Sequence, residues 1–230
     1  MRLDYIQDAA GWLHREIWTN KELLWPDRHP TAIEMLQPET AAYILDLEYM
    51  ELPNLGSPAF GLNGQRFRPA GLLDRQASRV AISTEFPVAV QRFTGAHEIG
   101  HWMLHDGMVM HRDKPLDGSQ SRESRAPVEC EADQFAATFL MPPNLLTDLF
   151  RAQFKVRDQF IFNDQTSFHL NPLDPHALLL AEEGSLDREI ALARCRSFGG
   201  RRLVPLAQQF NVSDSAMAIR IKELGLVRWP

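Results

Sequence analysis

The sequence is poor in the features that mark exported, membrane-spanning or disulfide-built proteins. It has only two cysteines, Cys130 and Cys195, among 230 residues, which is too few for a disulfide framework or a cysteine-rich metal site. Its N-terminus has no basic segment followed by an apolar run, and no stretch approaches the roughly 18 apolar residues that span a bilayer. We therefore expect a cytoplasmic protein without a membrane segment.

An excess of positive charge is also absent. The chain has 24 Lys and Arg against 30 Asp and Glu, a formal net charge of -6, so the protein as a whole does not attract nucleic acid or an anionic membrane. Any contact with nucleic acid must be local. With 44% hydrophobic and 23% charged residues, a chain of this length builds one substantial core and a small second module.

The first part of the chain, to about residue 87, predicts helices followed by a small sheet. Apolar residues recur at helical spacing from Ile6 to Ile17, and Thr31 with Glu34 matches a capping box. Residues 43–50 alternate in hydrophobicity with a period of two, which favours a strand. Farther on, two apolar runs on either side of a polar turn predict a hairpin; they are residues 70–73 and 80–83. We expect these strands to form a small antiparallel sheet.

A predicted helix around residues 93–105 has ionisable residues beside its apolar stripe. At about 100° per residue, His97 and His101 lie one turn apart on nearly the same side, so two imidazoles can bind one ion. Glu98 lies about 60° beyond His101, where it can face a bound water without being a ligand. This is the H-E-x-x-H arrangement of zinc proteases, with two neutral ligands, an open metal position and a base. The alternative is a solvated, histidine-rich helix face.

A second predicted helix, residues 127–140, offers a third ligand. Its buried stripe leaves Glu129 facing inward, whereas Glu131 is expected to face water. Asp133 lies one turn beyond Glu129 and is placed to accept the second ring N–H of a ligating histidine, which would fix the tautomer of that histidine. The alternative is that both glutamates only favour the N-terminal turn of the helix through its dipole.

These segments resemble the ImmA/IrrE family of zinc metallopeptidases. The resemblance covers about half of the chain and rests on residues 92–105 (RFTGAHEIGHWMLH), 129–137 (ECEADQFAA), 139–142 (FLMP), 71–74 (GLLD) and 82–83 (IS). It implies that His97, His101 and Glu129 bind one Zn²⁺ and that Glu98 is the base. Members of this family are bacterial or phage regulatory proteases that cleave helix-turn-helix repressors in stress, DNA-damage or mobile-element circuits. The resemblance therefore implies a repressor as the protein substrate.

Residues 151–202 depart from the compact form of this family and are interpreted as an insertion. The segment has an aromatic-rich stretch from Phe154 to Phe168, a proline-punctuated loop and a predicted helix over residues 185–196. It either packs against the catalytic core or serves as a substrate-docking or regulatory element. His169 and His176 lack ligand spacing, as does His111, which is expected in a loop and could polarise an oxyanion.

The last segment, residues 203–230, predicts a helix-turn-helix-like module. Asn211 tolerates the tight turn and Ser213 is a good N-cap for the second helix. From Arg196 onward, six basic and two acidic residues give a formal charge of +4. Binding of DNA is therefore conceivable, although Arg220 and Lys222 are the only obvious contacts on the second helix, and a purely structural module is the alternative.

Together these patterns predict an α+β protein. Its mostly helical, zincin-like (gluzincin) catalytic domain spans residues 1–150 and includes the small antiparallel sheet; the insertion and the C-terminal module follow. We expect a zinc endopeptidase; the alternative is a metal-containing regulator that binds DNA or a partner without cleaving it. Glu98 separates the two, because a structural metal site needs four protein ligands and no base. Cys195 is interpreted as a buried thiol or as a removable fourth ligand of a latent enzyme.

Overall fold

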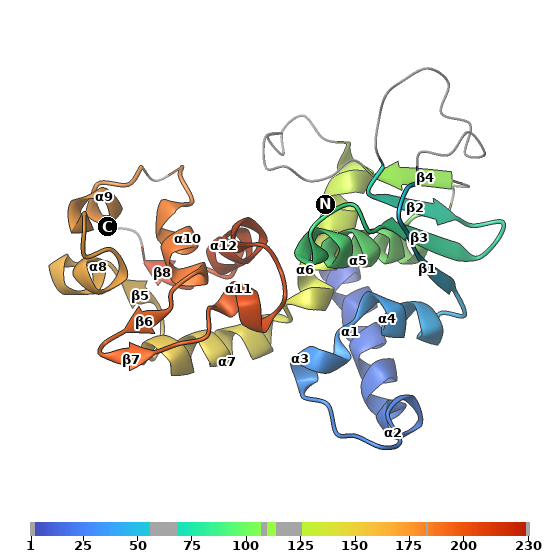
Figure 1. The fold of residues 1–230 in the computed structure, drawn as a ribbon, viewed down its shortest axis with the longest axis horizontal. Coiled ribbons are helices and arrows are strands. Elements are labelled where there is room, and N and C mark those ends of the chain that lie inside the picture. The colour runs from blue at the N-terminus through green and yellow to red at the C-terminus, as the bar shows by residue number, and fades with distance from the viewer. Residues whose placement is uncertain (1–2, 56–68, 107–109, 114–125, 183, 229–230) are drawn as a thin grey trace. The chain divides into compact units, whose positions relative to one another are not determined.

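In the computed structural model, residues 3–55, 69–106, 110–113, 126–182 and 184–228 are described (Figure 1). The chain divides into two compact units, Met1–Leu140 and Met141–Pro230. Helices predominate and the sheets are small, so the predicted α+β class is confirmed. None of the described helices is long and apolar enough to cross a membrane.

Helices make up most of the first unit. They are α1 (Leu3–Thr19), α2 (Lys21–Leu24), α3 (Ala32–Met35), α4 (Pro38–Ile44), α5 (Val88–Leu104) and α6 (Pro127–Leu140). The predicted apolar stripe of α1 is confirmed, since Ile6 and Ile17 mark the two ends of its buried face. The predicted capping box is also present. The N–H of Glu34 donates to the Thr31 hydroxyl, and the Thr31 N–H donates to the Glu34 carboxylate at 2.7 Å.

The sheet of the first unit is mixed. Its strands are β1 (Glu48–Leu52), β2 (Gly71–Asp74), β3 (Arg79–Ser83) and β4 (Met110–Asp113), in the order β1-β3-β2-β4. The predicted hairpin is confirmed as the antiparallel pair β2–β3. The expectation of a purely antiparallel sheet is wrong, because β1 pairs with β3 in parallel. Alternating hydrophobicity identifies a strand but does not specify its partner.

The strand predicted over residues 43–50 begins later than expected. Tyr43 and Ile44 belong to α4, and only the residues from Glu48 onward form β1. The chain leaves α4 at Asp46, whose φ of 55° is left-handed, while the Leu47 N–H donates to the Ala42 carbonyl at 2.9 Å. This closure is the usual hydrogen-bonded end of a helix. Pro38 favours the start of a helix, and the hydrogen-bonded closure at Asp46 ends it, so residues 38–44 form α4 despite the period-two pattern.

The elements of the first unit stack in layers around α5. Strands β2 and β3 contact one side of α5, α6 contacts another, and α1 packs against α6 (Figure 1). From Thr94 to His101 every residue of α5 is buried. A helix that is buried on all sides normally has apolar residues all round, so the polar residues in this stretch need partners within the core.

The second unit combines short helices with two small strand pairs. Its elements are α7 (Pro143–Phe154), β5 (Phe160–Ile161), α8 (Asp164–Leu170), α9 (Pro175–Leu179), α10 (Asp187–Ala193), β6 (Ser197–Phe198), β7 (Arg201–Arg202), α11 (Leu206–Gln209), α12 (Asp214–Glu223) and β8 (Val227–Arg228). The helix predicted over residues 185–196 is therefore present as α10. Strand β5 pairs in parallel with β8, and α10 packs on α12. Residues 151–202 and 203–230 thus share one core.

Aromatic side chains and a buried arginine hold this core together. Phe154, Phe160 and Phe198 contact one another, with each pair of ring centroids 5.5 Å apart. Arg188 is 1% exposed and donates to the carbonyls of Leu178 and Leu179 at 2.7 and 2.8 Å, which ties α9 to α10. These contacts pack the aromatic-rich segment within the second unit.

The C-terminal helices have the predicted turn. Asn211 has a φ of 52°, and Ser213 caps α12 by accepting the Ala216 N–H at 3.1 Å. Arg220 is only 3% exposed; its guanidinium donates to the Met141 carbonyl at 3.1 Å and to the Glu223 carboxylate at 3.2 Å. Arg220 therefore serves packing within the second unit.

We predict that His14 makes the stability of the first unit depend on pH. Its ring Nε2 lies 2.9 Å from the Phe139 carbonyl on α6, and burial lowers the pKa of His14 below its usual 6.5. The unfolded chain therefore binds the proton more readily than the folded protein does. The stabilising contribution is complete above about pH 6.5 and declines as the pH falls below that value.

The test compares the melting temperatures of the wild type and His14→Gln between about pH 7.5 and 5.5, a range that spans the usual histidine pKa. As the pH falls, we expect the melting temperature of the variant to decrease less than that of the wild type, because glutamine does not titrate. His97 and His101 are present in both proteins, so the difference isolates His14. An equal decrease in both proteins would show that His14 does not contribute.

Candidate metal centre

Two histidines on α5 lie with their ring nitrogens close together. His97 and His101 are both fully buried, and their Nε2 atoms are 3.0 Å apart. The rings meet edge to face, with centroids 4.6 Å apart. The one-turn spacing that the sequence predicted therefore brings both imidazoles to the same point.

Glu129 on α6 brings a carboxylate to the same point. Its oxygens lie 3.4 Å from the His97 Nε2 and 3.6 Å from the His101 Nε2. Among the described residues, these three form a group whose potential ligand atoms lie within 4.8 Å of one another. Bonds of about 2.0 to 2.1 Å in tetrahedral geometry put neighbouring ligand atoms about 3.3 Å apart. The donor types and their separations therefore fit a zinc ion with one open position.

Gly100 permits the two helices to approach this closely. A Cβ atom at Gly100 would lie 3.2 Å from the Cα and the carbonyl oxygen of Ala132 and 3.1 Å from a ring carbon of Phe135. The backbone of α6 thus packs directly against α5 one residue before His101. Helical spacing within residues 92–105 does not indicate this contact at Gly100, which depends on where α6 lies.

Asp133 lies where the sequence predicted it. Its Oδ1 is 2.9 Å from the Nδ1 of His97, and the residue is buried. A neutral His97 that donates its Nδ1–H to this carboxylate keeps a lone pair on Nε2, the atom that faces Glu129. The contact between Asp133 and His97 thus matches that of an outer partner of a metal-binding histidine.

The expectation that Glu131 faces water is wrong. Its side chain is only 26% exposed and its Oε2 lies 3.1 Å from the Nε2 of His105. The position of Glu131 relative to the buried stripe predicted exposure to water, but α5 packs along α6 and covers the flank of that stripe as well. A residue at an intermediate angle can therefore meet the end of α5.

Glu98 is buried against the sheet. Its side chain is fully inaccessible, and a Cβ at Gly71, the first residue of β2, would lie 2.7 Å from its Oε1 and 2.5 Å from the Thr94 side chain. Only a glycine leaves room there for the Glu98 carboxylate. Gly71 is one of the residues on which the family resemblance rests, but nothing in the sequence indicates that it lies against Glu98.

Arg75, in the turn between β2 and β3, holds the end of α5. Its guanidinium donates to the carbonyls of His101, Trp102 and His105 at 2.6, 2.7 and 3.1 Å and lies over the Trp102 ring. A cation at a helix C-terminus satisfies carbonyls that have no partner within the helix. Desolvation lowers the pKa of Arg75. From the sequence, Arg75 is only part of the polar turn between residues 70–73 and 80–83.

Other candidate residues lie outside this group. His111 is on β4 opposite Leu73, so its assignment to a loop is wrong. Cys195 belongs to the second unit, where its thiol donates to the Ser197 carbonyl at 3.2 Å and burial raises its pKa. These contacts support the interpretation of Cys195 as a buried thiol.

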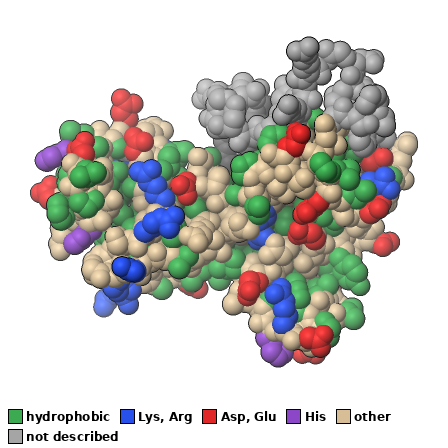
Figure 2. Space-filling model, in the orientation of Figure 1, with side chains coloured by type: hydrophobic (Ala, Val, Ile, Leu, Met, Phe, Trp, Pro, Cys, Tyr) green, Lys and Arg blue, Asp and Glu red, His purple; other side chains and the backbone are tan. Residues whose placement is uncertain are grey.

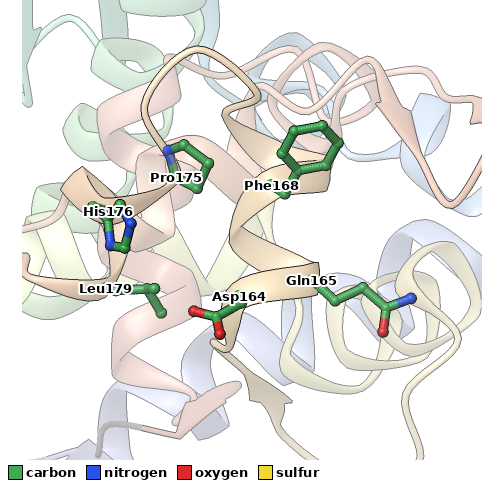
Figure 3. Close-up of a pocket in the computed structure, with 6 residues that line it drawn as sticks. All are labelled: Asp164, Gln165, Phe168, Pro175, His176 and Leu179. Atoms are coloured by element: carbon green, nitrogen blue, oxygen red, sulfur yellow. The ribbon is translucent and has the colours of Figure 1, made fainter.

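The second unit also has an open hollow, to which α8 and α9 each contribute three residues (Figure 3). Its lining residues are Asp164, Gln165, Phe168, Pro175, His176 and Leu179. Asp164 and His176 are both exposed. The hollow includes none of the residues that the sequence assigned to the metal or to catalysis.

We predict that Glu129→Ala abolishes stoichiometric zinc binding, because removal of its carboxylate leaves two ligands. Glu131→Ala is the matched control on the same helix and is expected to bind one zinc ion when the metal is in excess. Metal analysis of both purified variants, loaded with excess zinc and then desalted, measures the stoichiometry. Retention by the Glu129 variant together with loss by the Glu131 variant would overturn the ligand assignment.

A comparison with known protein families identifies a domain that includes this site. A search of curated proteins found no match. The family model described as the IrrE N-terminal-like domain, of the M78 peptidases, matches residues 58–170, just under half of the chain. The matched region includes α5 and α6 and hence His97, His101 and Glu129. Residues 58–170 thus form an IrrE N-terminal-like domain, which confirms the resemblance to the ImmA/IrrE family of peptidases.

Proposed function

We propose that the chain is a zinc-dependent endopeptidase in which His97, His101 and Glu129 bind the metal. The observation that carries the proposal is the convergence of two imidazoles and one carboxylate, with separations that fit zinc, within a peptidase-family domain. Three protein ligands leave the open position that catalytic zinc sites need. When bound, a zinc ion supplies a Lewis acid that activates water and polarises a peptide carbonyl. The mostly helical core is accordingly proposed to be zincin-like.

Glu98 is the proposed general base. It follows His97 directly on α5, and its buried carboxylate lies against Gly71 of β2. This carboxylate accepts a proton from the attacking water and then donates it to the amine of the cleaved peptide bond. The close fit under β2 limits the positions that the side chain can take, which favours a fixed base.

The proposed substrate is a helix-turn-helix transcriptional repressor. This proposal rests on the resemblance to a family of regulatory proteases, and it implies a cytoplasmic role in a bacterial or phage stress, mobile-element or defence circuit. Residues 151–202 are the segment in which we propose substrate docking, because most of the segment lies beyond the matched family region, which ends at residue 170. The segment also includes exposed apolar side chains such as Phe168 and Leu173.

The alternative, a regulator that binds DNA without cleaving protein, has less support. Lys and Arg side chains gather on the second unit (Figure 2), and Arg196, Arg201 and Arg202 are exposed. However, Arg220 is buried, and the exposed first turn of α12 has Asp214, which would repel a phosphate. The helix-turn-helix-like module is therefore proposed to be structural.

The substrate proposal is tested by incubation of the purified protein with helix-turn-helix repressors encoded near it. Gel electrophoresis and mass spectrometry identify fragments and the cleaved bond. We expect cleavage that a zinc chelator prevents and that added zinc restores. Cleavage that continues with the chelator present would contradict a zinc mechanism.

We predict that Glu98→Gln retains one zinc ion and the native fold but loses nearly all cleavage. Glutamine keeps the size of the side chain and removes the carboxylate that accepts the proton, a step for which general-base catalysis contributes about 10² to 10⁴ in rate. Cleavage rate, zinc content and circular dichroism are measured on the same preparation. Wild-type cleavage by this variant would show that Glu98 is not the base.

A further inference from the structure

We propose that His105 and Glu131 form a hydrogen-bonded relay that positions His101 as a metal ligand. The inference rests on the proposed zinc site. The Nδ1 of His101 lies 3.0 Å from the Nδ1 of His105, and the Nε2 of His105 lies 3.1 Å from the Oε2 of Glu131. The chain of contacts therefore leads from the ligand to a carboxylate on α6.

The proton positions along this chain are consistent with one arrangement. A neutral His101 that binds metal through Nε2 has its proton on Nδ1 and donates it to the Nδ1 of His105. His105 must then have its own proton on Nε2, which donates to Glu131. Every ring nitrogen in the relay thus has a partner, and the carboxylate at its end selects the tautomer of both rings.

The two ligating histidines therefore reach carboxylates by different routes. His97 donates directly to Asp133, whereas His101 needs His105 as an intermediate. Both carboxylates come from the first turns of α6, within the Glu129–Asp133 segment that also supplies the ligand. The alternation of Glu129, Glu131 and Asp133 thus gives one proposed metal ligand and two outer partners.

The end of α5 holds His105 in place for this role. His105 is the residue after the helix, with φ of -132° and ψ of 72°, and its N–H still donates to the His101 carbonyl at 3.1 Å. Arg75 binds the carbonyls of both residues. The side chain of His105 is only 9% exposed, so the imidazole ring has few alternative orientations. These contacts make His105 a positioning residue.

The test measures zinc affinity by competition with a chromophoric chelator, without any substrate. We expect His105→Leu and Glu131→Ala each to weaken zinc binding about 10- to 100-fold, the usual effect of losing an outer partner. Glu131→Gln keeps an oxygen that accepts the His105 N–H, so we expect a smaller loss. The double variant His105→Leu/Glu131→Ala is expected to bind no more weakly than His105→Leu, because both changes break one relay.

His14→Gln is the matched control, since it alters a half-buried, hydrogen-bonded histidine of the same unit that is outside the relay. We expect it to leave the zinc affinity unchanged. In cobalt-loaded protein, the relay variants are expected to shift the visible absorption bands, which report ligand geometry, and the control is not. Additive losses in the double variant would contradict the relay.

The outcomes for the relay and for the proposed function can be told apart. If the wild type binds no zinc, the metal site and the relay are both wrong. If the wild type binds zinc and the folded His105→Leu and Glu131→Ala proteins bind it equally well, the relay alone is wrong. Circular dichroism establishes folding for each variant, and Glu131→Ala changes a partly exposed residue should His105→Leu not fold.

Discussion

The close approach of α5 and α6 at Gly100 determines the distances on which the metal centre depends. His97 and His101 come from one helix and Glu129 from the other, so the separations of 3.4 and 3.6 Å between the Glu129 carboxylate and the two imidazoles hold only while the helix backbones are in contact. A side chain at Gly100 would meet the backbone of Ala132. Because packed interiors have little free volume, such a contact moves one helix relative to the other and changes both of these separations together.

Burial makes this centre costly to assemble and therefore specific. His97, Glu98 and His101 are fully inaccessible, and buried polar groups are stable only when they have partners. Carboxylates of α6 provide partners for the imidazoles, either directly through Asp133 or through His105 and Glu131. The hairpin contributes from the other side, since Arg75 binds carbonyls at the end of α5. The sheet and α6 thus fix the same helix from two directions.

Two arginines of the second unit are buried and bind backbone carbonyls within that unit. Arg188 binds the end of α9 and Arg220 binds the Met141 carbonyl, so neither guanidinium belongs to the exposed basic surface. The pairing of β5 with β8 joins the segment after residue 150 to the C-terminal strand. A role in substrate docking would therefore use the exposed surfaces of α8 and α9, because the other faces of this segment are needed for its own core.

The sequence by itself determined the helix that bears His97, Glu98 and His101, because one-turn spacing is a property of the local backbone. It also determined the capping box at Thr31, the β2–β3 hairpin and the inward position of Glu129. Tertiary structure decided the parallel partner of β1, the end of α4, the pairing of Glu131 with His105, and the roles of Gly71, Gly100 and Arg75. Each of these features depends on which segment, distant in the sequence, packs beside the residue in question. Helical or strand periodicity specifies only the face of its own element on which a residue lies, so it cannot identify that neighbour.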